Sequence, residues 1–156
     1  MQGNPAGLEL RNEVQTPELT AINQYFVDAK MCENWGYARL AAHVREDSID
    51  EMRDAEALID RILYLDGVPN LQRLGTVRVG ETVPEKLHLA LDVETEAITR
   101  LNRAIAVATE LGDNGSRELF EKILLGEEEH ADWLEAQLDL IEQVGEAHYL
   151  AQQIKE

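Results

Sequence analysis

Apolar residues recur every three or four positions along four long stretches of this 156-residue chain, and charged residues fill the positions between them. This spacing is typical of α-helices that bury one face and expose the other. Start and stop signals place the four predicted helices at residues 4–36, 38–65, 82–112 and 117–145. A short amphipathic tail, residues 146–154, follows the last of them. The pattern therefore predicts an all-α protein.

The connections between the predicted helices decide how they are arranged. Two connections are short, whereas residues 66–81 lack helical periodicity and are long enough to cross a bundle, with residues 76–79 briefly extended. One long crossover predicts an up-down-down-up four-helix bundle, in which residues 146–154 form a short C-terminal fifth helix. We expect a single domain, 1–156, because this length is enough for one hydrophobic core.

Local signals at the helix starts support these boundaries, with one exception. Asn4 before Pro5 is a typical helix start, and Thr82 with Glu85 forms a capping box. Pro17, however, lies inside the first predicted helix, where a proline removes a backbone hydrogen bond and costs roughly 3 kcal/mol. We expect either a kink there or a restart of the helix with Thr16 as its N-cap.

One glutamate interrupts the apolar stripe of each long helix: Glu18, Glu51, Glu94 and Glu127. Each occupies a position that the helical pattern assigns to the core of the bundle. Removing an unpaired carboxylate from water costs at least several kcal/mol, so four of them sharing one core require cations. The interrupted stripes therefore predict a buried metal centre.

The residues that follow two of these glutamates sharpen the prediction. Bundles that hold a pair of metal ions use a glutamate from each of two helices and a Glu-x-x-His motif from each of the other two. Glu127 and His130 form one such motif, while Glu51 and Asp54 form the second with aspartate in place of histidine. Carboxylate and imidazole ligands without cysteine favour iron or manganese.

Tyr25 lies two helical turns after Glu18 on the same stripe. It has two interpretations. The tyrosine is either a hydrogen-bond donor or radical relay beside the metal centre, or an ordinary residue of the hydrophobic core.

Composition narrows the classes of function. The chain carries a formal net charge of −17 and no cluster of Lys and Arg, which argues against nucleic-acid binding and suits both solubility and the attraction of cations. The single cysteine, Cys32, excludes an internal disulfide framework. We find no signal peptide and no apolar run of the roughly 20 residues that a membrane span needs, and we expect a cytoplasmic protein that binds no membrane.

The chain resembles the bacterioferritin family over essentially its full length, in four segments: 18–26, 51–52, 61–71 and 127–135. The resemblance implies a ferritin-like fold and oxidation of Fe(II) at a di-iron ferroxidase centre within one subunit. It further implies storage of Fe(III) as a mineral inside a 24-subunit shell built of dimers, and an electron-donor ferredoxin that assists iron release. A second kind of bacterioferritin subunit that co-assembles with this one is an open alternative.

The resemblance also implies haem b between two subunits, held by a methionine from each. Met52 matches that position and directly follows Glu51, so the two side chains point about 100° apart on the helix. The alternative is a methionine that fills a gap at a subunit interface.

Asp54 departs from the family pattern, which has histidine at this position. Two hypotheses follow. In one, the aspartate binds metal and its extra negative charge changes the redox properties of a working centre. In the other, the centre is impaired and the subunit serves haem binding or assembly. A DNA-protecting mini-ferritin and a rubrerythrin-like peroxidase fit less well, because all four helices contribute ligands and the chain has no Cys-x-x-Cys motif.

Overall fold

The structure is a computed structural model that describes residues 2–70 and 75–155, except for the side chain of residue 16. The described part contains five α-helices and no β-strand: α1 (Pro5–Asn34), α2 (Ala38–Tyr64), α3 (Val83–Glu110), α4 (Asn114–Val144) and α5 (Glu146–Ala151). Residues 76–79, expected to be briefly extended, belong to no regular element. Among the described residues, no helix is both long and apolar enough to cross a membrane.

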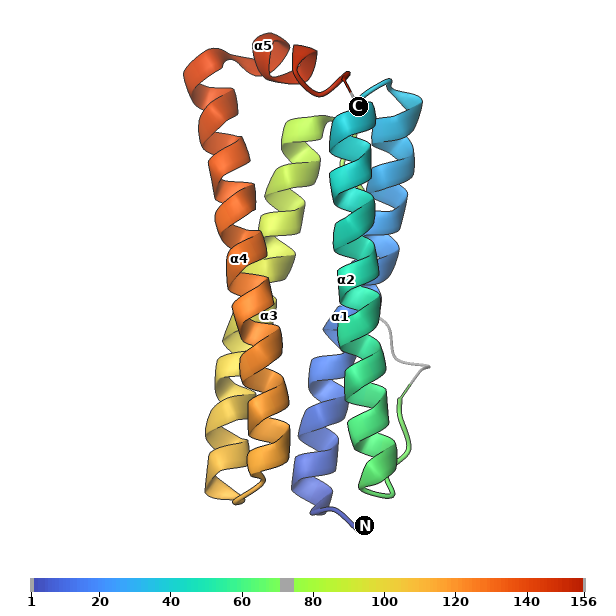
Figure 1. Cartoon of the computed structure of the whole chain (residues 1–156), viewed down its shortest axis with the longest axis vertical. Helices are drawn as coiled ribbons and strands as arrows, with labels where there is room; N and C mark the ends of the chain where they lie inside the picture. Colours follow the sequence, from blue (N-terminus) through green and yellow to red (C-terminus); the bar gives the residue numbers. More distant parts are fainter. Residues whose placement is uncertain (1, 71–74, 156) are drawn as a thin grey trace.

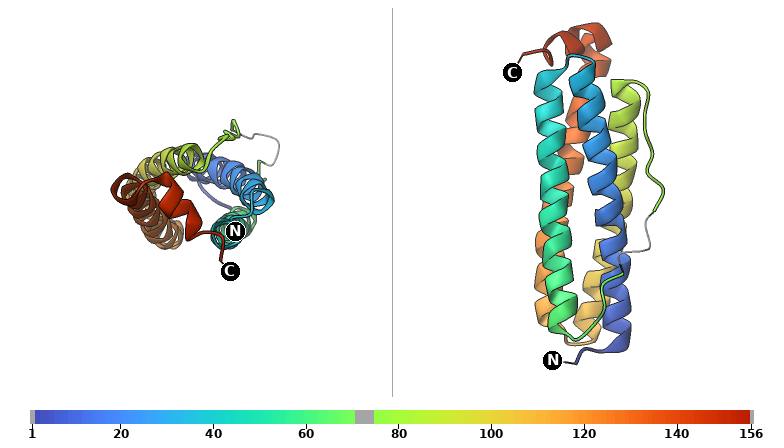
Figure 2. Two further views of the ribbon diagram at one scale, coloured as in Figure 1. Left: turned by 90° about the horizontal axis from the view of Figure 1, so that it is seen from above. Right: turned by 90° about the vertical axis from the view of Figure 1, so that its right-hand side faces the viewer.

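The four long helices form an up-down-down-up bundle (Figure 1). α1 packs mainly against α2, and α3 packs mainly against α4, so the bundle consists of two helical hairpins. The described parts of the connection between α2 and α3, residues 65–70 and 75–82, lie along the side of the bundle, and α5 lies across its upper end (Figure 2). The predicted all-α fold with one crossover and a short fifth helix is therefore confirmed.

Side chains cap the helices where the sequence predicted their starts. The side chain of Asn4 accepts a hydrogen bond of 2.9 Å from the N–H of Ala6 at the start of α1. Thr82 accepts one of 3.3 Å from the N–H of Glu85 at the start of α3. α4 begins at Asn114, three residues earlier than expected, because Asp113 rather than a later residue is its N-cap.

α1 continues through Pro17 as one helix, so the expected restart with Thr16 as N-cap is wrong. Val14 and Ala21, on either side of the proline, are each only 3% exposed and lie on the same buried face. Packing of this continuous face outweighs the loss of one backbone hydrogen bond, which costs roughly 3 kcal/mol.

The hydrophobic core divides into two clusters along the bundle axis. The upper cluster, toward α5, consists of Ala21, Tyr25, Cys32, Leu40, Ala41, Val83, Leu87, Ala90, Val93, Leu134 and Tyr149. The lower cluster, toward the N-terminus, consists of Leu10, Val14, Leu58, Leu101, Ala104, Ala108, Phe120 and Ile123. The layer between the two clusters is where the four interrupting glutamates lie.

A polar network, which we term the lower clamp, joins α1 and α2 to the start of α4. It consists of Arg11, Arg61, Asp113 and Ser116: both arginines pair with Asp113, and their Nε atoms donate to Ser116 Oγ at 2.7 and 3.1 Å. Gly115 makes room for it, since a Cβ there would lie 2.5 Å from Arg61 Nη2. The clamp holds the two hairpins together at this end.

A buried ion pair lies within the upper half of the bundle. Lys86 Nζ on α3 donates to Asp28 Oδ1 on α1 at 2.9 Å, and both side chains are 4% exposed. The same ammonium group contacts Met31 Sδ at 3.1 Å and lies 5.4 Å from the centre of the Trp35 ring. The charge on Asp28 is therefore matched inside the protein.

Candidate metal centre

The middle layer of the bundle receives one buried glutamate from each long helix. Glu18, Glu51, Glu94 and Glu127 are 2%, 4%, 0% and 3% exposed, on α1, α2, α3 and α4 respectively. Their apolar neighbours on each stripe pack into the upper and lower clusters, which places the four carboxyl groups together. Helical periodicity turns each glutamate toward the bundle axis, and the packing of the four helices brings them to one level.

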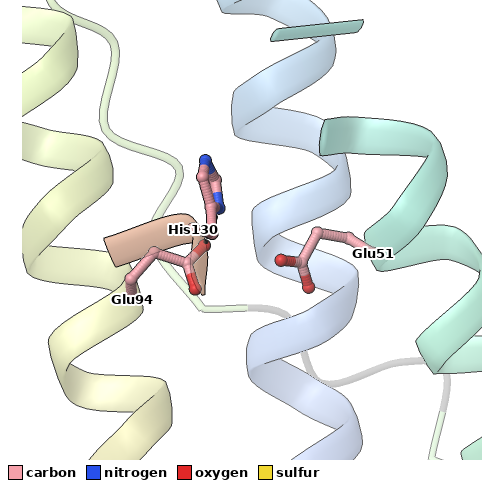
Figure 3. A group of neighbouring side chains, drawn as sticks. All are labelled: Glu51, Glu94 and His130. Atoms are coloured by element: carbon pink, nitrogen blue, oxygen red, sulfur yellow. Dashed lines mark hydrogen bonds and ion pairs between the residues drawn. The ribbon is translucent and has the colours of Figure 1, made fainter. Parts of the chain in front are cut away.

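The six predicted ligands form two groups whose potential ligand atoms lie within 4.8 Å of one another. One group contains Glu51, Glu94 and His130, and Figure 3 shows these three side chains pointing toward one another from α2, α3 and α4. The other group consists of Glu18, Glu51, Asp54 and Glu127. Glu51 belongs to both groups and is therefore the residue that joins them.

His130 is held by a carboxylate on each side of its ring. Its Nδ1 lies 2.9 Å from Glu94 Oε1, and its Nε2 lies 3.0 Å from Asp47 Oδ2. With Nε2 occupied by Asp47, the Nδ1 atom faces the ligand group, which is the arrangement that fixes a metal-binding histidine. Asp47 is absent from the predicted site residues, although it precedes Glu51 by four positions and so shares its helix face.

Tyr25 lies beside the same carboxylate. It is 1% exposed, and its hydroxyl group donates to Glu94 Oε1 at 2.5 Å. The tyrosine ring meets the His130 ring edge-on, with 5.3 Å between the ring centres. The structure thus places Tyr25 as a hydrogen-bond donor next to two predicted ligands, while a role as a radical relay stays a prediction.

Comparison with known proteins agrees with this fold. The ferritin-like domain family matches residues 9–144. The bacterioferritin of Mycobacterium leprae is 53% identical over 97% of this chain and 96% of its own length. That of Streptomyces coelicolor is 53% identical over 100% of this chain and 93% of its own. That of Mycobacterium tuberculosis (strain CDC 1551) is 51% identical over 97% of this chain and 96% of its own length. The chain belongs to the bacterioferritin family.

Burial dominates the electrostatics of the centre in this bacterioferritin chain. Burial, with contributions from Asp54 and Glu94, raises the pKa of Glu18 to about 8. Burial and the neighbouring Glu18 raise the pKa of Glu51 well above its ordinary value. The pKa of Asp54 rises to about 7, again mainly because of burial. These carboxyl groups therefore hold protons near neutral pH, and a bound cation would displace those protons.

The basic and phenolic groups respond to the same carboxylates. Burial lowers the pKa of His130, but hydrogen bonds to Asp47 and Glu94 outweigh it and raise the value to about 10. Burial and the charge of Glu94 raise the pKa of Tyr25 well above its ordinary value. His130 is accordingly a cation and Tyr25 a neutral donor at neutral pH.

Two carboxylate oxygens in the layer fit a bound cation. Glu18 Oε2 and Glu94 Oε2 are fully buried, and neither has a hydrogen-bond partner. An unpartnered buried acceptor is costly, and a charged one more so. A cation between the four helices would satisfy both oxygens, and a set of carboxylate and imidazole ligands suits iron.

Met52 lies outside the ligand groups of this bacterioferritin chain. Its side chain is 55% exposed, whereas that of the preceding Glu51 is 4% exposed. The two residues therefore face opposite environments, as their 100° separation on the helix requires. Met52 is available for contact with a second molecule.

Proposed function

We propose that this bacterioferritin chain binds two iron ions and oxidises Fe(II) to Fe(III), which it stores as a ferric mineral. The ligands would be Glu18, Glu51, Asp54, Glu94, Glu127 and His130. The observation that supports the proposal is the convergence of four buried glutamates, one from each helix, with two oxygens left unpartnered.

In this proposal the iron ions are the substrate, and each ligand group receives one of them. Glu51 is shared between the ions, Asp47 holds Nε2 of His130, and Tyr25 donates a hydrogen bond to Glu94. Binding of Fe(II) displaces the protons that burial keeps on Glu18 and Glu51, because cations bind the ionised carboxylates. Oxygen or peroxide then accepts the electrons that iron gives up.

Asp54 takes part in metal binding in the preferred version of this proposal. Its carboxyl oxygen belongs to the group with Glu18, Glu51 and Glu127, which supports a direct contact with one ion. Compared with histidine, the aspartate adds a negative charge and favours Fe(III) over Fe(II).

Stopped-flow measurement of Fe(II) oxidation tests the proposal, with Asp54→His and Asp54→Ala as variants. A working centre oxidises iron faster than iron alone does, changes its rate in Asp54→His, and slows in Asp54→Ala. If the wild type is no faster than free iron while Asp54→His is, the chain is instead an impaired subunit that serves haem binding or assembly.

We further propose a 24-subunit shell built of dimers, in which Met52 from each of two subunits binds haem b. The exposure of Met52 beside the buried Glu51 supports this position. Partners in this proposal are an electron-donor ferredoxin and, as an alternative to a homo-oligomer, a second bacterioferritin subunit.

Sedimentation measures the size of the assembly. A haem absorbance band that appears on haem addition, and that Met52→Leu loses, tests the ligand; a band unchanged in Met52→Leu would contradict it.

A single domain, 1–156, and a cytoplasmic location complete the proposal. Both rest on the sequence and stay predictions.

A further inference from the structure

A small cavity lies in the upper half of the bundle, next to the metal centre. Its volume is about 20 Å³, and Tyr25 and His130 are among the residues that line it. His130 itself belongs to the ligand group of Figure 3, and Tyr25 donates to Glu94 Oε1, so the cavity borders that group. A cavity of this volume holds one molecule of the size of water or dioxygen.

Three of the polar side chains that border the cavity, His130, Tyr25 and Lys86, already have partners. The two ring nitrogens of His130 face Glu94 and Asp47, and the hydroxyl group of Tyr25 donates to Glu94. Lys86 Nζ is surrounded by Asp28, Met31 and the Trp35 ring. A buried water molecule needs two to four polar partners, and these three groups are already engaged with other side chains.

Asp28, Cys32, Asp47 and Trp133 also line the cavity, and of these Asp28 is bonded to Lys86 and Asp47 to His130. The remaining wall, which is most of its surface, is apolar. It includes Val83, Leu87, Ala90 and Leu134, which belong to the upper core cluster and are all less than 9% exposed. Apolar cavities stay dry and take up small apolar molecules. The lining therefore favours a neutral, apolar guest over water.

We propose that this cavity binds dioxygen and holds it beside His130 for the oxidation of iron. The inference rests on the proposed ferroxidase function and specifies where its oxidant binds. In the reaction, two Fe(II) ions lose one electron each, and dioxygen takes up these two electrons and two protons from the solvent to form hydrogen peroxide. A dioxygen molecule held there lies next to His130, one of the proposed ligands.

Xenon tests the site directly, because it is apolar and visible to X-rays. Crystals of the full-length metal-free protein under xenon pressure are expected to show a xenon atom between Ala90, Leu134 and His130. An ordered water molecule in this cavity, or the absence of xenon from it, overturns the proposal.

A filling variant tests the role in the reaction. Ala90→Leu occupies the cavity, while Ala41→Leu adds the same bulk to the same core cluster outside the cavity lining and serves as the control. In Ala90→Leu, the dioxygen concentration that gives half the maximal rate rises by on the order of tenfold, while anaerobic Co(II) binding is unchanged. Ala90→Val is the milder variant if the leucine prevents folding.

The outcomes separate the two proposals. If the wild type oxidises Fe(II) and both filling variants keep its dependence on dioxygen, the cavity proposal is overturned and the ferroxidase proposal stands. If the wild type itself does not oxidise Fe(II) under dioxygen, the ferroxidase proposal is overturned and the dioxygen site with it. A raised half-saturating concentration in the Ala90 variants alone supports both.

Discussion

Two regions of this bundle bury carboxylates, and they differ in the partners that they provide for the carboxylate oxygens. In the upper half, Asp28 is paired with Lys86 at 2.9 Å, and both are 4% exposed. In the middle layer, Glu18 and Glu94 are equally buried, yet each has an oxygen without any partner. In the upper half, the chain itself provides the counter-charge, since Lys86 on α3 pairs with Asp28 on α1. In the middle layer it leaves two carboxylate oxygens without a hydrogen-bond partner, and the proposed cation would supply that partner.

The difference has an energetic meaning. Breaking a buried ion pair leaves an uncompensated charge, whereas an open carboxylate site adjusts by keeping protons until a metal ion arrives. In the absence of metal, removing one partner of the Asp28 and Lys86 pair should therefore destabilise the protein. Removing one carboxyl group of the middle layer should stabilise it. Four experiments, ordered from the largest expected effect to the smallest, test this contrast.

Glu51→Gln should have the largest effect, because Glu51 belongs to both ligand groups. Loss of a side chain that only holds a metal ligand in place lowers metal affinity or activity roughly 10- to 100-fold. Loss of a ligand shared by two ions should therefore slow Fe(II) oxidation on the order of 10³-fold or more. The metal-free variant should melt at a higher temperature than the wild type. Stopped-flow kinetics and thermal unfolding measure the two effects. Glu56→Gln, at an exposed position of the same helix, is the control, and a less stable metal-free Glu51→Gln protein would contradict the contrast.

Lys86→Met should destabilise the protein without abolishing metal binding. The variant leaves Asp28 buried without its partner, and such a loss costs about 3–5 kcal/mol of unfolding free energy. Urea unfolding of the metal-free protein measures it. The double variant Asp28→Leu, Lys86→Met replaces the pair with apolar groups and should recover most of the stability. A single variant as stable as the wild type would show that the pair does not balance a buried charge.

The stability of the metal-free protein should fall as pH rises. Glu18 has a folded pKa of about 8 against an ordinary 4.5, so between these values the folded state keeps a proton that the unfolded state has lost. His130, with a folded pKa of about 10 against 6.5, acts in the same direction between 6.5 and 10. The folded state binds more protons in both windows, and stability should fall by on the order of a few kcal/mol from pH 5 to pH 9.

Urea unfolding across this pH range checks the prediction, with and without Co(II). The metal ion should reverse the trend, because it binds the ionised carboxylates and its affinity rises with pH. Stability that rises with pH in the metal-free protein would contradict the raised pKa values of the centre.

Asp47→Ala should have the smallest of these effects. It removes the partner of His130 Nε2 but no predicted ligand, and loss of such a partner weakens metal binding roughly 10- to 100-fold. Calorimetric titration with Co(II) measures the affinity. Asp50→Ala, one helical turn away and exposed, is the control. Equal Co(II) affinities in the two variants would show that Asp47 does not support metal binding.

The two regions also differ in how far sequence predicts them. The four glutamates could be predicted because each interrupts an apolar stripe whose period is a property of one helix. The Asp28 and Lys86 pair could not, since Lys86 looks like a surface lysine until α1 and α3 are placed side by side. Asp47 was missed for the same reason, because its partner His130 lies on another helix. The restart considered at Pro17 was wrong because local propensity ignores the continuous buried face around it.

The lower clamp carries a consequence for how sequences of this kind can change. Arg61 covers Gly115 so closely that a methyl group at position 115 would overlap the guanidinium group. A side chain at position 115 would push the flexible end of Arg61 aside and away from Asp113 and Ser116, so it would weaken the clamp. Across relatives that keep this contact, the two positions should co-vary, with arginine at one found together with glycine at the other.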